Sequence, residues 1–143
     1  MREVKRSALV AASPTRMYEL INDVEQYPAF VPWCEWARVE SATDSEIVAT
    51  LGVKRGPLQF EFTTRNVLFP CQRIELQLDQ GPFRSLSGGW LISAVGKSGS
   101  RIELTLRFEF ASILSAAMFE PMFVETAASL VDAFVARARA DSK

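Results

Sequence analysis

Several segments of this chain alternate apolar with polar residues, and this period of two limits the fold more than any other feature. The clearest segment is Ile102–Phe110, where large apolar side chains alternate with Glu, Thr and Arg. Residues 47–53, 60–65 and 74–79 share the period, and an apolar stretch at 88–92 resumes it after a Gly-Pro break. Because short turns join these segments, the pattern predicts an antiparallel meander with one buried face.

Helical patterns lie on both sides of this meander. Residues 2–11 alternate loosely and predict a first strand. Ser13-Pro14 then supplies an N-cap followed by proline at the first helical position. The next apolar residues recur at helical spacing, and we expect them to form the buried face of a helix that ends near residues 22–25. They are Met17, Leu20, Ile21 and Val24.

The last thirty or so residues return to a helical period. We expect a stripe formed by Leu114, Ala117, Met118, Met122, Ala128, Val131, Phe134, Val135 and Ala138. Pro121 interrupts this pattern and predicts a kink or short break at residues 119–121. The whole order predicts one α+β domain over residues 1–143. Its curved antiparallel sheet of about six to seven strands wraps around a long C-terminal helix, with two short helices after the first strand.

The segment Tyr27–Trp36 is unusually apolar for a connector. Pro28 and Pro32 prevent one regular helix from running through it, yet it carries Phe30, Val31, Trp33 and Trp36. Connectors are normally polar because they lie on the surface. This segment therefore either packs as a plug against the core or covers an apolar ligand as a lid.

Composition excludes several kinds of chemistry. The chain has no histidine, which removes histidine-based triads and the commonest metal ligand, and we expect no metal site and no cofactor. The net charge of −1 favours no contact with DNA. Cys34 and Cys71 are expected to be inert cytosolic thiols. Without a signal peptide or a membrane-span-length apolar run, we predict a cytoplasmic protein with at most peripheral contact to the inner membrane.

Several short sequence motifs, and their order along the chain, resemble the START-like helix-grip superfamily of polyketide cyclases, dehydrases and lipid transporters. Within it, they are most similar to the branch of bacterial ribosome association toxins and mitochondrial coenzyme Q-binding proteins. The resemblance runs nearly end to end, and Pro121 departs from it. The segments that carry it are residues 6–10, 17–23, Tyr27-Pro28 with Phe30-Val-Pro32 and Cys34, residues 62–66, 81–83, 88–90, 108–110 and Ala133-Phe134 with Arg137-Ala138.

The resemblance implies an apolar cavity between the sheet and the C-terminal helix. The aromatic residues on the sheet are either ordinary core or the wall of this cavity, and both alternatives remain open here. Phe83, after Gly81-Pro82, is expected on a loop opposite the connector. The predicted cavity and lid residues are Phe30, Val31, Trp33, Trp36, Phe60, Phe62, Phe83, Trp90, Leu106, Phe108, Phe119 and Phe123.

Three functions follow from the resemblance. The first is non-enzymatic binding of an isoprenoid quinone such as ubiquinone, or of a lipid, in support of respiration. The alternative is binding to the large ribosomal subunit, which would block subunit joining, with Lys54, Arg55 and Arg65 as RNA contacts. The third is an oligoketide cyclase, for which Glu35 is the best candidate acid, although no carboxylates are paired at a diagnostic spacing.

Overall fold

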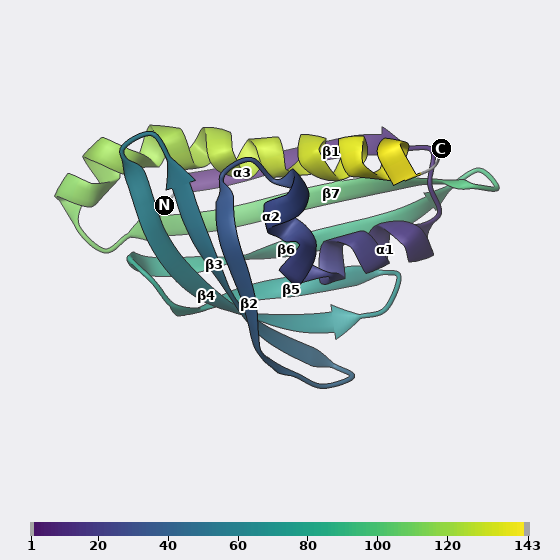
Figure 1. Ribbon diagram of the computed structural model, residues 1–143, viewed down its shortest axis with the longest axis horizontal. Coiled ribbons are helices and arrows are strands. Elements are labelled where there is room, and N and C mark those ends of the chain that lie inside the picture. Colours follow the sequence, from purple (N-terminus) through teal and green to yellow (C-terminus); the bar gives the residue numbers. More distant parts are fainter. Residues whose placement is uncertain (1, 142–143) are drawn as a thin grey trace.

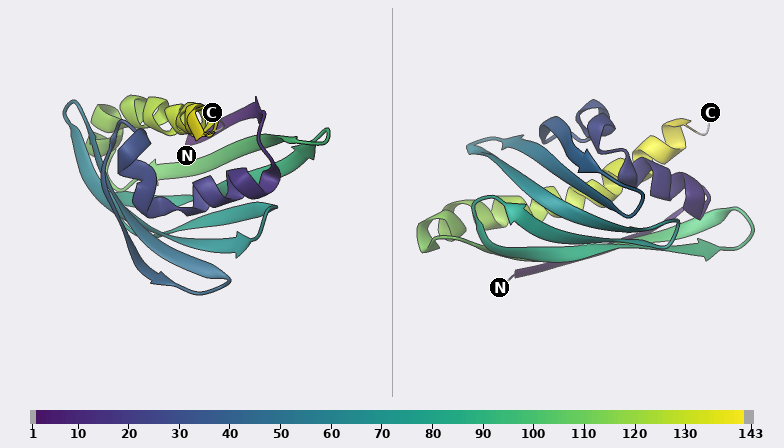
Figure 2. Two further views of the ribbon diagram at one scale, coloured as in Figure 1. Left: turned by 45° about the vertical axis from the view of Figure 1, so that its right-hand side comes forward. Right: turned by 90° about the horizontal axis from the view of Figure 1, so that it is seen from below.

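The computed structural model describes residues 2–141, in which a seven-stranded antiparallel sheet curves around one long helix (Figures 1 and 2). The strand order is β1-β7-β6-β5-β4-β3-β2, so the first strand lies beside the last. The elements are β1 (Arg2–Val10), α1 (Pro14–Asn22), the 3-10 helix η1 (Val24–Gln26), α2 (Tyr27–Phe30), β2 (Cys34–Ala42), β3 (Glu46–Arg55), β4 (Leu58–Phe69), β5 (Arg73–Gln80), β6 (Phe83–Val95), β7 (Gly99–Phe110) and α3 (Ile113–Asp141). This confirms the predicted fold class.

Strand β7 shows how the alternation becomes a core. Its apolar residues from Ile102 to Phe110 are all buried, whereas Arg101 and Arg107 on the other face are exposed. Side chains alternate across a strand, so one face of β7 packs towards α3 and the other meets solvent. The helix α3 lies against the concave face of the sheet (Figure 2), and its Phe134 is fully buried.

The beginning of α1 follows its sequence signal. Ser13 is the N-cap and its Oγ accepts a hydrogen bond from the backbone N–H of Arg16 at 3.1 Å. Pro14 occupies the first turn, where a missing N–H costs nothing. The predicted apolar face is confirmed, because Met17, Leu20 and Ile21 are buried.

Strand β2 begins inside the segment that the sequence predicted to be a connector. Tyr27–Phe30 forms the short helix α2, and Cys34 starts β2, so the connector prediction was wrong for residues 34–36. Strand β2 lies at the edge of the sheet, and after Cys34 it has no buried residue. Two register shifts also interrupt its pairing with β3. An edge strand of this kind lacks the apolar alternation by which strands are recognised.

Strand β6 begins earlier than predicted. Its first residue is Phe83, which is 5% exposed, so the expectation of a loop position for Phe83 was wrong. The turn between β5 and β6 contains Gly81 at φ +152°, a backbone conformation that favours glycine. A Gly-Pro pair therefore marks a hairpin turn here, and β5 and β6 run antiparallel beside each other.

The helix α3 continues through Pro121 without a break, although Figure 1 shows its first turns inclined to the rest. The predicted apolar stripe is wrong in this N-terminal part, where Leu114 is 70% and Met118 57% exposed. By length and composition α3 is apolar enough to cross a membrane. Its buried face packs on the sheet. That face consists of Phe123, Thr126, Ala127, Leu130, Val131, Phe134 and Ala138.

Candidate functional site

An apolar cavity lies between the inner face of the sheet, the first helices and α3. Its volume is about 70 Å³, measured as the space open to the centre of a water molecule. Three of its lining residues, Leu51, Thr64 and Leu76, are partly exposed, so the cavity opens to solvent beside β3, β4 and β5. The lining consists of Val24, Tyr27, Trp33, Ala49, Leu51, Phe62, Thr64, Asn66, Leu76, Leu86, Trp90, Leu104, Leu106, Phe123, Ala127 and Leu130.

The structure brings part of the predicted cavity set together. The predicted residues that line the cavity are Trp33, Phe62, Trp90, Leu106 and Phe123. Val31 is buried in the core without reaching the cavity, and Phe119 is partly buried against the core. Phe30 is also partly buried and packs edge-on against Phe134, with ring centroids 5.4 Å apart.

Six phenylalanines form a second group beside the cavity. Phe83 stacks on Phe110 with a centroid distance of 4.8 Å, and Phe108 meets Phe123 edge-on at 4.8 Å. Phe62 and Phe123 belong to both this group and the cavity wall. We call this set the phenylalanine cluster; its members are Phe60, Phe62, Phe83, Phe108, Phe110 and Phe123.

Trp36 lies on the other side of the sheet. It pairs with Gly52 across β2 and β3, and its indole lies over that glycine. A Cβ at position 52 would come within 2.2 Å of the Trp36 Nε1 atom. The Arg38 guanidinium stacks on the same indole at 5.1 Å from the ring centroid. Trp36 therefore covers the outer face of the sheet and not the cavity.

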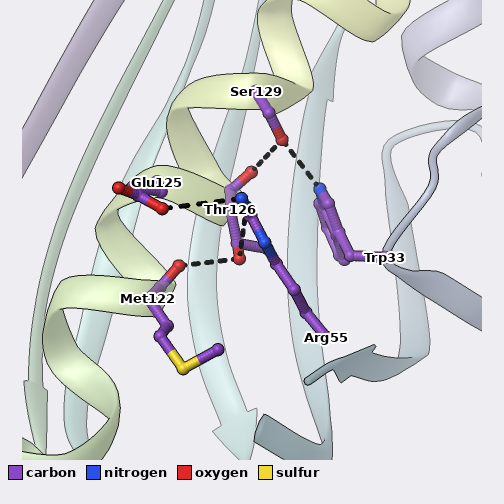
Figure 3. A network of polar contacts seen from close by, with 6 residues as sticks. All are labelled: Trp33, Arg55, Met122, Glu125, Thr126 and Ser129. Carbon is purple, nitrogen blue, oxygen red and sulfur yellow. Dashed lines mark hydrogen bonds and ion pairs between the residues drawn. The ribbon is translucent and has the colours of Figure 1, made fainter. Parts of the chain in front are cut away.

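A hydrogen bond joins the connector to α3 (Figure 3). Trp33 Nε1 donates a hydrogen bond to Ser129 Oγ at 3.1 Å, and Ser129 Oγ donates to the Thr126 carbonyl oxygen at 2.7 Å. Arg55, at the end of β3, donates to Thr126 Oγ1 at 3.3 Å. One stretch of α3 thus binds both the connector and the β3–β4 hairpin, and the connector packs as part of the core.

Two polar side chains interrupt the apolar lining, and sequence reasoning missed both. Thr64 and Asn66 are two residues apart on β4, so both point to the inner face. Thr64 Oγ1 donates to Asn66 Oδ1 at 2.7 Å. The signal that could have found them is a pair of polar residues at the apolar phase of a strand that otherwise buries Phe62 and Leu68.

The cavity also contacts two aromatic residues whose polar atoms are already used. Tyr27 donates its hydroxyl proton to the Ile21 carbonyl oxygen, and the Trp33 N–H is held by Ser129. Burial, with smaller contributions from Cys34 and Asp23, raises the pKa of Tyr27 well above its usual value. Neither side chain therefore offers a free donor to the cavity.

The three predicted RNA contacts do not form one patch. Lys54 and Arg55 lie at the β3–β4 turn, whereas Arg65 is seven residues along β4 from Leu58, which is roughly 23 Å at the usual rise per residue. Each is paired with an acid. Lys54 Nζ lies 3.7 Å from Glu35, and Arg65 lies 3.4 Å from Glu46 and 3.8 Å from Asp79. Arg55 lies 3.5 Å from Glu125.

The candidate groups for acid–base or thiol chemistry lie outside the cavity lining. Glu35 is exposed and pairs with Lys54. Burial raises the pKa of Cys34 to about 11, and its thiol faces the Trp36 carbonyl oxygen at 3.4 Å. Between residues 2 and 141, no group of three or more Cys, Asp or Glu side chains is placed to hold a metal ion.

Comparison with known proteins identifies relatives along almost the whole chain. "Ribosome association toxin RatA" of Pseudomonas aeruginosa is 41% identical over 136 residues, covering 95% of this chain and 94% of the relative. RatA of Escherichia coli K12 is 40% identical, covering 97% and 88%. "Coenzyme Q-binding protein COQ10 homolog B, mitochondrial" of Xenopus laevis is 28% identical, covering 92% of this chain and 56% of the relative. The names of the two RatA relatives describe ribosome association and not catalysis.

Solved structures share the fold at lower identity. A START superfamily protein from Mycobacterium smegmatis superposes with a TM-score of 0.80 at 22% identity, covering 96% and 97% of the two chains. The ZhuI aromatase/cyclase from Streptomyces sp. R1128 gives 0.87 at 20%, covering 99% and 96%. The model of the family "Polyketide cyclase / dehydrase and lipid transport" matches residues 10–135. The chain therefore belongs to the polyketide cyclase/dehydrase and lipid transport family and has its START-like helix-grip fold.

Proposed function

We propose that this protein associates with the ribosome by binding the large subunit, and that it thereby blocks subunit joining. The observation that supports this most is the end-to-end identity of about 40% to proteins named ribosome association toxin. An identity of 41% over 136 residues amounts to about 56 positions. Fewer than 40 described residues are buried, so the shared residues extend over the surface, where a partner would bind.

Sedimentation tests this function directly. Purified protein is mixed with ribosomal subunits and separated on a sucrose gradient at low magnesium and low salt. We expect the protein in the large-subunit fraction and, when magnesium is raised, fewer joined ribosomes in its presence. Protein that stays at the top of the gradient at low salt would refute ribosome association.

Charge reversals locate the contact. Lys54→Glu and Arg65→Glu each change an exposed side chain whose ion pairs are worth little to the fold. If these residues contact phosphates, each substitution lowers the amount bound and flattens its salt dependence. Lys97→Glu, in the exposed β6–β7 turn, is the matched control and should bind like the wild type. Normal binding of both test variants would place the interface elsewhere.

A second function is favoured by the cavity itself. We propose that the cavity takes up part of a neutral apolar ligand, an isoprenoid quinone or a lipid, and that this binding supports respiration. The lining is almost wholly apolar, and the Xenopus relative at 28% identity is named for coenzyme Q binding. Burial of apolar ligand surface would contribute roughly 25 cal/mol per Å², less the cost of ordering.

Filling the cavity tests this second function. Ala127→Leu adds a side chain to the cavity wall, whereas Ala136→Leu makes the same change on the exposed face of the same helix. Native mass spectrometry of gently purified protein, with lipid extraction, should find a ligand near one-to-one in the wild type and in Ala136→Leu, and less in Ala127→Leu. An empty wild-type protein that stays empty after incubation with quinones would refute ligand binding.

A further inference from the structure

The inner face of β4 carries a polar pair where every neighbour on the sheet is apolar. Thr64 faces Ala49 on β3 and Leu78 on β5, and Asn66 faces Ile47 and Leu76. Asn66 is 8% exposed, and the cavity is the space that it borders. A polar side chain buried in this way normally has its hydrogen bonds satisfied within the protein.

Only the oxygen of the Asn66 side-chain amide has a hydrogen-bond partner within the described residues. Its Oδ1 accepts from Thr64 Oγ1, and its amide nitrogen has no hydrogen-bond partner in residues 2–141. An amide nitrogen carries two donors, and this one is accessible to water, since it is not among the fully buried unpaired atoms of residues 2–141. The hydroxyl of Tyr27 and the indole N–H of Trp33, both at the cavity, already donate to protein acceptors. The indole N–H of Trp90, which also lines the cavity, has no hydrogen-bond partner in the part of the chain that the structure describes. The donors of the lining that lack an acceptor therefore lie on Asn66 and Trp90, and Asn66 supplies two of the three.

We propose that Asn66 is the hydrogen-bond donor that selects a carbonyl-type oxygen on the ligand, with Thr64 holding its amide in place. This inference rests on the proposed binding of an apolar ligand in the cavity. A quinone oxygen, an ester carbonyl and a ketone share the required chemistry, since each is a neutral acceptor on an apolar body. A carboxylate is excluded, because no cationic side chain lines the cavity and an unpaired buried charge is costly.

Three small probes of one size separate the ligand classes. Acetophenone carries the carbonyl, isopropylbenzene has the same outline without it, and benzoate carries a charge. Asn66→Leu removes the donors and Asn66→Asp replaces them by an acceptor. For acetophenone we expect each variant to raise Kd about tenfold, equivalent to about 1.4 kcal/mol. For isopropylbenzene, Asn66→Leu should leave Kd unchanged or lower it, and benzoate should not bind the wild type.

Nitrogen–proton NMR gives both the affinity and a direct view of the contact. The Asn66 side-chain amide signal is identified by its absence from the Asn66→Leu spectrum, and backbone signals of both variants show whether they fold. Acetophenone should shift the amide signal more than isopropylbenzene does. If either folded variant binds acetophenone as tightly as the wild type, the donor role of Asn66 is overturned while cavity binding stands. If neither neutral probe binds the wild type, cavity binding and this inference fail together.

Discussion

Trp33 on the connector and Ser129 on α3 are joined by a hydrogen bond of 3.1 Å between the indole nitrogen and the serine oxygen. The same tryptophan accepts a backbone hydrogen bond at 2.9 Å from Lys54 N–H through its carbonyl oxygen. Its side chain is 6% exposed and forms part of the cavity wall. One residue therefore joins the connector, β3 and α3 at the edge of the proposed ligand site.

Removal of the acceptor should weaken this junction measurably. Ser129→Ala leaves the Trp33 N–H unpaired, and we expect a loss of about 1–2 kcal/mol in the free energy of unfolding. Trp33→Phe removes the donor, so the two substitutions together should cost less than the sum of the single ones. Urea unfolding followed by circular dichroism measures these differences, with the exposed Ser93→Ala as control. Strictly additive losses would mean that the hydrogen bond contributes nothing.

The position of the Trp36 indole should make glycine necessary at position 52 for full stability. A methyl group at position 52 would overlap the Trp36 indole, so Gly52→Ala must displace that ring. We expect a destabilisation of about 1–3 kcal/mol, as in overpacked sites, and a change in tryptophan fluorescence. In a Trp36→Ala background the indole atoms that lie nearest to the added methyl group are absent, so the same glycine substitution should cost much less. Equal cost in both backgrounds would show that the glycine serves another purpose.

The sequence predicted the fold well where one face of an element is buried and the other is wet. Strand β7 and helix α1 are of this kind, because burial makes the residue pattern follow the backbone period. Strand β2 could not be found in this way, since it is an edge strand with almost nothing buried. At the start of α3 the predicted apolar stripe is wrong for the opposite reason, because Leu114 and Met118 are apolar residues that are exposed.

The candidate site was predictable only in part. Aromatic residues on strands indicated an apolar interior, but periodicity cannot separate the cavity wall from the packed phenylalanine cluster beside it. Trp36 was assigned to the connector, and a register shift at the start of β2 accompanies its position on the outer face. Asn66 was missed because one polar residue among the apolar positions of a strand looks like an irregular alternation and does not by itself indicate a functional site.

Pro121 should reduce the stability of the long helix. It lies inside α3 on an exposed position, where it removes one backbone hydrogen bond. We expect Pro121→Ala to raise the free energy of unfolding by about 1–2 kcal/mol, since the gain in helix is partly offset by a freer unfolded chain. Urea unfolding measures this change. A loss of stability instead would show that the inclined first turns are needed to seat Phe123 in the core.

The stability of the protein should fall in mildly alkaline solution because of Cys34. Burial raises the pKa of its thiol from 9.0 to about 11, so the folded protein holds this proton more tightly than the unfolded chain does. The resulting stabilisation is complete below pH 9 and is lost as the pH rises through 11. Between pH 9 and 10 we expect a loss of about 1 kcal/mol in the free energy of unfolding, before Tyr27, whose pKa is also raised, adds its own effect.

Urea unfolding at pH 7, 9 and 10 measures the slope of the free energy of unfolding against pH. Cys34→Ala should flatten that slope whatever its effect on absolute stability, and an unchanged slope in this variant would show that the thiol proton is not responsible.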